Sequence, residues 1–251
     1  MNNLLDLWEA DKAVINAWLS IHNSFTAEAF GKMGWDSVTI DLQHGQSDYQ
    51  SSISMLQALS DSQSVPMVRI PWNEPGIIMK LLDAGFLGII CPMINNEIDC
   101  KKFVQTTKYV PQGFRSSGPT RAALVHGANY HNEANDHIIT LAMIETEEGL
   151  DNVEKISSVD GLSGIYVGPS DLSVSLGLKP GLDRTEEIMI KAIEKIRMTC
   201  KKNNKKIGIH CLSTNYLNDK FKEGFDLATI GSDVRFFTEI VGKKLSEINY
   251  E

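Results

Sequence analysis

The stretch GIYVG at residues 164–168 is a short apolar run without a charged side chain, and the polar sequence PSDLS follows it at residues 169–173. An apolar run of this length is typical of a parallel strand that is covered on both faces. The stretch LGII at residues 87–90 has the same character. Both runs therefore favour a parallel sheet.

Outward from these runs, short β-branched segments alternate with longer amphipathic ones, which indicates repeated βα units. The predicted strands are Ala13–Leu19, Ser37–Asp41, Pro66–Ile70, Leu87–Cys91, Ile139–Glu145, Gly164–Gly168, Lys206–His210 and Leu227–Gly231. The predicted helices are Thr26–Lys32, Tyr49–Leu59, Glu74–Ala84, Ile98–Lys108, Glu147–Ile156, Glu186–Asn203, Leu217–Glu223 and Arg235–Ile248. Their strict alternation favours an α/β fold, a single (β/α)8 TIM barrel over residues 1–251. An open doubly wound sheet is the alternative that pattern counting leaves open.

One connection is much longer than the others. It spans Tyr109–His137, about thirty residues, and contains Gly113, Gly118 and Pro119. A loop of that length inside a compact domain is usually functional or contains a helix of its own. No linker, repeat or low-complexity segment divides the chain, so we expect one domain.

The composition, with 42% hydrophobic and 22% charged residues, is that of an ordinary globular protein. The net charge of −8 argues against a general binder of nucleic acid or of anionic membranes, which needs a basic surface. No apolar run is long enough to span a bilayer, and the opening MNNLLDLWEADK does not resemble a signal peptide. The four cysteines lack CxxC spacing and are expected to be free thiols, mostly in the core. We therefore expect a cytoplasmic protein.

Two carboxylates follow neighbouring predicted strands. Glu145 comes directly after the apolar run Leu141–Ile144, and Asp171 follows the Gly168-Pro169 turn. Polar residues at the carboxyl ends of barrel strands face the active site, where two acids repel each other unless a cation lies between them. A hard divalent cation takes such oxygen ligands. The alternative is that Glu145 begins the next helix and Asp171 caps one.

Two more strand ends carry candidate groups. Arg69 closes an otherwise apolar strand, so it either forms a salt bridge with Asp41 or Asp83 or stabilises an enolate or carboxylate of a substrate. His44 follows the second strand, and a single histidine there is structural, exposed or an acid–base group. The other histidines have no HxH or HExxH spacing and give no signal for zinc.

Eight segments, in order along nearly the whole chain, resemble the HpcH/HpaI aldolase family of metal-dependent pyruvate aldolases. These segments are DLQHG at 41–45, PMVR at 66–69, WNEP at 72–75, LLDAG at 81–85, CPM at 91–93, PQGFR at 111–115, IET at 144–146 and GPSDLS at 168–173. The resemblance implies a barrel of the phosphoenolpyruvate/pyruvate type, commonly assembled into trimers or hexamers. It also implies a 2-oxo acid and an aldehyde as small-molecule partners.

The resemblance implies a role for each site residue. Glu145 and Asp171 would bind the metal, and two carboxylates suit Mg²⁺, Mn²⁺ and Co²⁺ alike. Arg69 would stabilise the pyruvate enolate, His44 would be the acid–base group, and Asp83 would hold that histidine. The implied substrate contacts are Arg69, Met143, Ser170, Asp171 and Leu212, with the backbone of Ser170 and Asp171 receiving the substrate carboxylate at a helix N-terminus.

Three positions depart from the family pattern or stand outside it. Met143 lies where the family has a glutamine that contacts the 2-oxo acid, and a thioether cannot donate a hydrogen bond. Ser116 replaces a glycine of the long loop. His210 and Cys211 end the seventh strand with polar groups, which we interpret as part of the core.

The leading hypothesis is a carbon–carbon lyase, a class II aldolase that cleaves or forms a bond between pyruvate and an aldehyde in a hydroxy-2-oxo acid. A CoA-ester lyase or another relative that forms carbon–carbon bonds is the second hypothesis, although no Gly-rich or basic segment indicates a nucleotide-binding surface. The third is a catalytically weakened protein that binds 2-oxo acids, and Met143 is its support.

Overall fold

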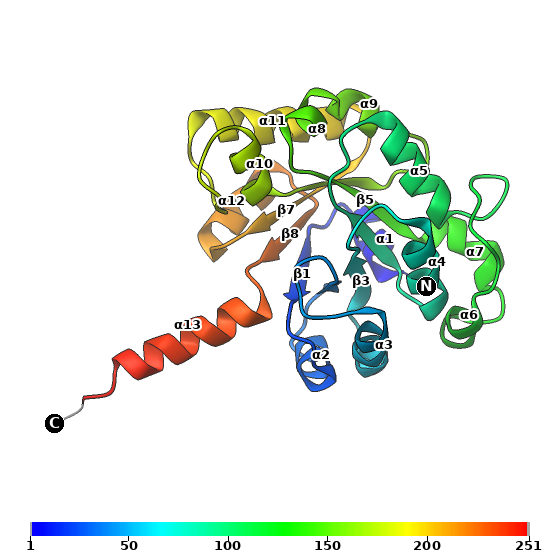
Figure 1. Ribbon diagram of the computed structural model, residues 1–251, viewed down its shortest axis with the longest axis horizontal. Coiled ribbons are helices and arrows are strands. Elements are labelled where there is room, and N and C mark those ends of the chain that lie inside the picture. The colour runs from blue at the N-terminus through cyan, green and yellow to red at the C-terminus, as the bar shows by residue number, and fades with distance from the viewer. Residues whose placement is uncertain (1, 250–251) are drawn as a thin grey trace.

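The first strand, β1 (Val14–Leu19), pairs in parallel with both β2 (Ser37–Asp41) and β8 (Leu227–Ile230), which closes the sheet. The computed structural model, which describes residues 2–249, thus forms a barrel of parallel strands in sequence order (Figure 1). The strands between these ends are β3 (Val65–Arg69), β4 (Gly88–Cys91), β5 (Ile139–Ile144), β6 (Gly164–Val167) and β7 (Lys206–Cys211). The predicted barrel is confirmed, and the open sheet is excluded.

The helices lie outside the barrel and at its ends (Figure 1). They are α1 (Asn3–Glu9), α2 (Ser24–Gly31), α3 (Tyr49–Ala58), the 3-10 turn η1 (Leu59–Asp61), α4 (Pro75–Ala84), α5 (Glu97–Thr107), α6 (Thr120–His126), α7 (Tyr130–His137), α8 (Glu147–Asp151), α9 (Val153–Ser157), α10 (Pro169–Ser175), α11 (Glu187–Lys202), α12 (Thr214–Glu223) and α13 (Asp233–Ser246). The long connection contains two helices of its own, α6 and α7. The predicted helix 147–156 is divided at Asn152 into α8 and α9.

Helix α1 was not predicted, because its seven residues are too few for a clear period. Asn2 caps it, and the buried Leu4 and Trp8 anchor it to the barrel. The Asn2 amide donates to the carbonyl of Leu87 before β4, and the Trp8 indole donates to that of Asp226 before β8. Helix α1 therefore ties together the amino ends of the strands, opposite the end where the site is expected.

Strand register places part of a polar network inside the barrel. The Asn16 side chain donates to Thr229 Oγ1 at 2.8 Å and accepts from the hydroxyls of Ser37 and Thr39 at 2.8 and 2.9 Å. All four residues are fully buried, so each hydrogen bond replaces one that water would have made. The network joins β1, β2 and β8 inside the barrel.

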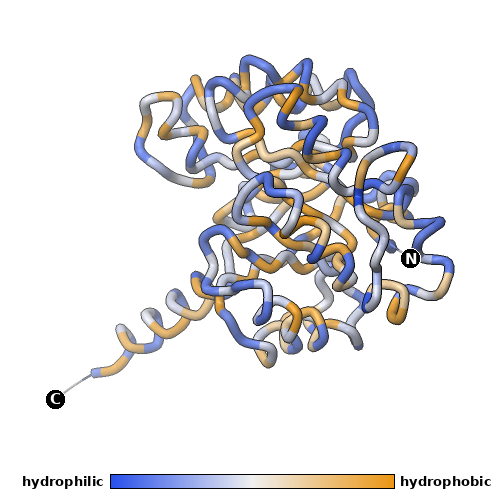
Figure 2. Tube along the Cα trace, turned by 45° about the vertical axis from the view of Figure 1, so that its right-hand side comes forward, coloured by the Kyte–Doolittle hydropathy of each residue, from blue (hydrophilic) through white to orange (hydrophobic). Residues whose placement is uncertain are grey.

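The C-terminal helix α13 extends away from the barrel instead of covering β8 and β1 (Figure 1). Among its described residues only Asp233 is buried. Apolar residues recur along it (Figure 2), and the most exposed include Phe237 at 62% and Leu245 at 56% of their full accessibility. Ile15 on β1 is 39% exposed. The helix itself was predicted, and its distance from the barrel was not.

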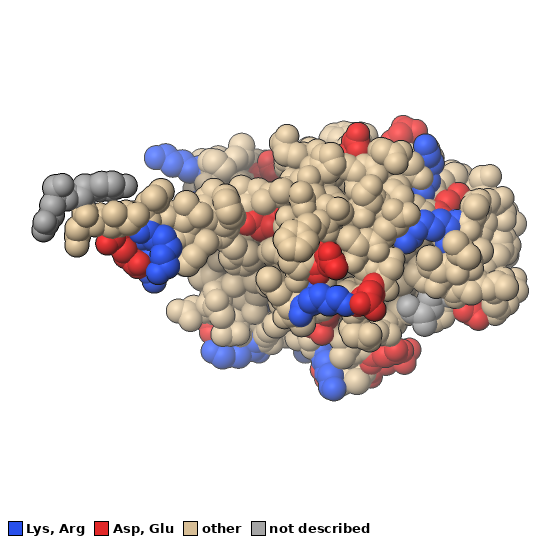
Figure 3. Space-filling view, turned by 90° about the horizontal axis from the view of Figure 1, so that it is seen from below, with Lys and Arg blue, Asp and Glu red and all other residues tan. Residues whose placement is uncertain are grey.

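The face seen in Figure 3 has acidic and basic side chains interspersed, without a continuous basic patch among the residues described there. This agrees with the net charge of −8. Over residues 2–249, no helix is both long enough and apolar enough to cross a membrane. All four cysteines are buried free thiols, as expected.

Candidate active site

A cavity of about 650 Å³ opens at the carboxyl ends of the strands, the end at which barrel enzymes carry their active sites. Its lining residues are Trp18, His44, Arg69, Met143, Glu145, Gly168, Pro169, Ser170, Asp171, Pro180, Gly181, Leu182, His210, Leu212 and Arg235. The cavity brings together every predicted site residue except Asp83. Chain segments more than 190 residues apart meet here, as shown by Trp18 and Arg235.

Glu145 lies immediately after β5 and is only 2% exposed. Its Oε1 accepts a hydrogen bond from the Met93 backbone N–H at 2.8 Å. Met93 has a positive φ of 55°, which a residue with a side chain rarely adopts, and that backbone conformation belongs to the turn that presents the N–H. Burial raises the pKa of the Glu145 carboxyl to about 7, and the charge of Asp171 adds to the rise. The Met93 N–H and the charge of Arg69 lower this pKa but do not offset the rise.

Asp171 lies in the first turn of α10 but does not cap it. The N-cap is Gly168, and the helix has no side-chain cap bond. A Cβ on Gly168 would lie 2.7 Å from Glu145 Oε2 and 3.2 Å from Met143 Cε, so only glycine permits this close approach of β6 to β5. Of the two interpretations of Asp171, the structure favours a side chain directed to the cavity over a helix cap.

Arg69 is held by Asp41 through two hydrogen bonds, Nε to Oδ1 at 2.8 Å and Nη2 to Oδ2 at 2.5 Å. Its guanidinium also lies 4.7 Å from the centre of the Trp18 ring, and the Trp18 indole donates to Asp41 Oδ2 at 3.2 Å. Burial would raise the pKa of Asp41, but the hydrogen bonds and charge of Arg69 outweigh it and lower that pKa. Within residues 2–249, Nη1 of Arg69 has no partner, so one edge of the guanidinium remains for a ligand.

His44 lines the cavity, and the structure does not bring Asp83 to it within one chain. Asp83 lies in the last turn of α4, which begins after β3 and runs back toward the other end of the barrel. There its Oδ1 accepts a hydrogen bond from Arg115 Nη2 at 2.8 Å. The expectation that Asp83 holds His44 was wrong for a single chain, because it took no account of helix direction. Arg69 was expected to form a salt bridge with Asp41 or Asp83, and in the structure its partner is Asp41.

His210 was interpreted as core but lines the cavity, so that interpretation is corrected. Its Nε2 lies 2.9 Å from the Gly231 carbonyl, which requires a proton on Nε2, and its Nδ1 lies 3.2 Å from the hydroxyl oxygen of Tyr166. Burial and then the charge of Arg69 lower the pKa of the His210 imidazole to about 4, so it is neutral at pH 7. Cys211 is buried, as expected.

Known proteins resemble this chain in sequence and in fold. The model of the family described as HpcH/HpaI aldolase/citrate lyase matches residues 15–239. The chain belongs to this family. It is 38% identical to a hydroxypyruvate/pyruvate aldolase of Rhizorhabdus wittichii over 234 residues, 93% of each chain, and 33% identical to a 5-keto-4-deoxy-D-glucarate aldolase of Citrobacter koseri over 93% of this chain and 91% of that one. A family member from Burkholderia cenocepacia superimposes with a TM-score of 0.92 at 27% identity, covering 98% of this chain and 99% of that chain.

Membership of the HpcH/HpaI family confirms the predicted resemblance and a carbon–carbon lyase of the aldolase type. The residue roles inferred from the motifs stay predictions. One family motif acquires a visible function, since Cys91-Pro92-Met93 supplies the N–H that holds Glu145.

A loop between α10 and α11 covers one side of the cavity in this HpcH/HpaI chain and was not predicted. Pro180, Gly181 and Leu182 line the cavity, and Asp183, with a φ of 45°, follows them. The Asp183 carboxylate accepts from the backbone N–H groups of Leu212 and Ser213 at 2.6 and 2.8 Å. The loop is thereby fixed to the carboxyl end of β7.

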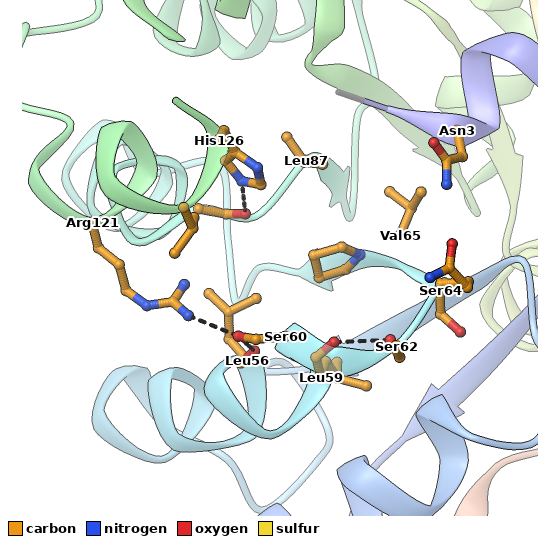
Figure 4. A pocket seen from close by; sticks show the side chains of 14 residues that line it. Asn3, Leu56, Leu59, Ser60, Ser62, Ser64, Val65, Leu87, Arg121 and His126 are labelled. Carbon is orange, nitrogen blue, oxygen red and sulfur yellow. Dashed lines mark hydrogen bonds between the residues drawn. The ribbon is translucent and has the colours of Figure 1, made fainter. Parts of the chain in front are cut away.

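A second, smaller cavity of about 210 Å³ lies at the opposite end of the barrel (Figure 4). Its polar side chains serve the backbone. Arg121 donates to the carbonyl of Ala84 and to Ser60, and His126 Nε2 lies 2.9 Å from the carbonyl of Gly85. These bonds satisfy carbonyls at the end of α4, so we interpret this cavity as structural.

Proposed function

We propose that the chain is a metal-dependent aldolase that joins pyruvate, as its enolate, to an aldehyde and cleaves the resulting hydroxy-2-oxo acid. The observation that carries the proposal is one cavity in which two carboxylates, Glu145 and Asp171, face a guanidinium already fixed by Asp41. The similar proteins described above, a hydroxypyruvate/pyruvate aldolase and a 5-keto-4-deoxy-D-glucarate aldolase, support the same chemistry.

The donor set fits a hard divalent cation such as Mg²⁺, Mn²⁺ or Co²⁺. Glu145 and Asp171 would hold it, and in residues 2–249 no group of three or more His, Cys, Asp or Glu side chains is placed to hold a metal ion. Such a cation keeps positions for a ligand and water, which suits a site with two protein carboxylates. When bound, it polarises the keto group of the 2-oxo acid.

The residues of the chain provide the remaining steps. Arg69 lines the cavity, and Nη1, which has no partner among the described residues, would donate to the oxygen on which enolate charge develops. His44 takes the proton of the C4 hydroxyl as the C3–C4 bond breaks, the aldehyde leaves, and the bond electrons form the enolate. A proton returned to C3 completes pyruvate. The first hydrogen bond within α10 runs from Leu172 N to Gly168 O, so the N–H groups of Ser170 and Asp171 precede it and form no bond within the helix. These two N–H groups are proposed to bind the substrate carboxylate.

Exchange of the pyruvate methyl protons with solvent tests this proposal without knowledge of the aldehyde. With Mg²⁺, Mn²⁺ or Co²⁺ present, we expect deuterium to enter the methyl group in D₂O, because enolate formation is reversible, and chelation should stop it. The measurement is the loss of the methyl proton NMR signal. A folded protein that shows no exchange with any of the three metals would contradict the proposal.

The two alternatives give different results in related assays. A CoA-ester lyase would turn over acyl-CoA esters and not free hydroxy-2-oxo acids. A weakened binding protein would bind a 2-oxo acid without exchanging its protons, and Met143→Gln would restore nothing.

Met143→Gln is expected to strengthen binding of the 2-oxo acid. Met143 is 3% exposed, lines the cavity, and reaches the glycine that precedes α10. An amide there gains one hydrogen bond to a charged ligand, which we expect to lower the KM for pyruvate about tenfold with little change in kcat. Met143→Leu, which keeps the apolar character, is the control. An unchanged KM in both variants would show that position 143 does not contact the 2-oxo acid.

We also propose a homo-oligomer, a trimer or hexamer, and a cytoplasmic location. The support for an oligomer is the apolar stripe of α13, in which Val234, Phe237, Val241 and Leu245 are exposed while the barrel surface at Ile15 lacks cover. Burying both surfaces in a second copy would remove this area from water. Sedimentation should give a multiple of the chain mass, and a stable monomer would contradict this part of the proposal.

A further inference from the structure

Arg235, in the first turn of α13, is an exposed cation that lines the active-site cavity. Across residues 2–249 its side chain forms no ion pair or hydrogen bond, in contrast to Arg69, which Asp41 holds by two. Nearby acids have other partners. The Asp233 carboxylate accepts from the backbone N–H groups of Ser20, Ile21 and Val234, and that of Asp183 accepts from two others. Arg235 thus presents an uncommitted guanidinium to the cavity.

The strand order of the closed barrel separates Arg235 from the proposed metal ligands. Glu145 and Asp171 follow β5 and β6, whereas Arg235 follows β8, which pairs with β1 on the other side of the ring. The cavity wall beside Arg235 is made by Trp18, His210 and Leu212. One side of the cavity therefore carries the carboxylates, and the other carries a cation among apolar and neutral groups.

The charges of the cavity leave Arg235 without a counterpart. A divalent cation would balance Glu145 and Asp171, and the pair of Arg69 and Asp41 is neutral. His210 is neutral at pH 7, and the positive charge of Arg235 contributes, after burial and Arg69, to the low pKa of its imidazole. The 2-oxo acid carboxylate is needed near the proposed metal. An additional anion on the substrate is what a free guanidinium on the far side would recognise.

We propose that Arg235 binds an anionic group, a carboxylate or a phosphate, at the aldehyde end of the substrate and so sets a preference for acidic aldehydes. This inference rests on the proposed function, since it concerns the second substrate of the same cavity. Glu239 lies one helical turn beyond Arg235. A helical salt bridge is less favourable when the acid follows the base by four residues, and no salt bridge joins these two side chains. At 100° per residue, Arg235 projects roughly 115° away from the centre of the apolar stripe of α13, so covering that stripe leaves it facing the cavity.

The test compares aldehydes with and without an anionic group in aldol addition to pyruvate. Glyoxylate carries a carboxylate, glyceraldehyde 3-phosphate carries a phosphate, and glycolaldehyde is neutral. For Arg235→Gln we expect kcat/KM to fall about 10- to 100-fold with the preferred anionic aldehyde, mainly through KM, and less than about 2-fold with glycolaldehyde. Arg235→Lys should retain part of the preference for anionic aldehydes. The aldehyde whose kcat/KM falls most in Arg235→Gln, glyoxylate or glyceraldehyde 3-phosphate, shows whether the residue binds a carboxylate or a phosphate.

Lys243→Gln is the matched control, because it removes one positive charge two helical turns further along α13, away from this cavity. It should leave the ratio of anionic to neutral aldehydes unchanged. Pyruvate exchange should be the same in all of these variants. If the wild type exchanges pyruvate protons and Arg235→Gln has the same ratio of kcat/KM for anionic to neutral aldehydes as the wild type, the inference is overturned and the proposed function is not. Absence of exchange in the wild type would instead overturn the proposed function.

Discussion

Glu145→Gln is expected to reduce metal-dependent exchange of pyruvate methyl protons by about 10³-fold or more. The amide keeps the shape of the side chain and still accepts from the Met93 N–H, but it removes one of two anionic ligands in the cavity. A metal ion supplies several kcal/mol of charge stabilisation to such a step, and each 1.4 kcal/mol is about tenfold in rate. Exchange rates measured by NMR, with Mn²⁺ affinity measured by calorimetry, would check this.

The control for this change is Glu148→Gln, since Glu148 is exposed on α8 only three residues away. We expect its exchange rate and its Mn²⁺ affinity to equal those of the wild type. In the absence of metal, Glu145→Gln should be at least as stable to heat as the wild type, because it no longer buries a charge without a cation. Undiminished exchange in Glu145→Gln would remove Glu145 from the proposed metal site.

Each part of the site that was predictable from sequence depends only on the local sequence of a single strand and of the residues that follow it. Glu145 could be identified because it follows a buried run, and Asp171 because it follows a glycine-proline turn at the next strand. Parallel strands of a barrel all end on the same side, so local patterns were enough to place these groups together. The barrel was predictable for the same reason, since each βα unit repeats the same local signal.

Other parts depend on contacts between distant segments. Trp18 and His210 have an ordinary apolar or polar pattern in their strands, and only the closed register shows that both face the cavity. Arg235 was predicted as the first residue of a helix, with nothing to indicate the cavity beside it. Asp83 is the opposite case, a residue that was predicted in the site and lies outside it. A motif placed it with His44, although helix α4 carries it to the other end of the barrel.

Arg69→Lys is expected to lower kcat by about 10²- to 10³-fold, the usual loss for one donor to a developing oxyanion. The guanidinium uses Nε and Nη2 on Asp41 and keeps Nη1 for the cavity. An ammonium group is a single point charge, so it cannot hold Asp41 at two positions and also present a fixed donor to the enolate. The KM for pyruvate should change much less, because the ground-state keto oxygen carries less charge. Steady-state cleavage and proton exchange would measure both quantities.

Asp41→Asn separates the catalytic part of Arg69 from its structural part. Arg69 remains but loses the charged partner that orients it, so we expect a smaller fall in kcat, about tenfold, because the donor is still present in a fraction of conformations. Asp41→Asn should also unfold more easily, since it leaves the buried charge of Arg69 uncompensated, and breaking a buried ion pair in this way costs about 3–5 kcal/mol. If Arg69 only supported the fold, activity per folded molecule would be equal in the two variants. A larger loss in Arg69→Lys at matched folded fraction is therefore the result that assigns the guanidinium to the reaction itself.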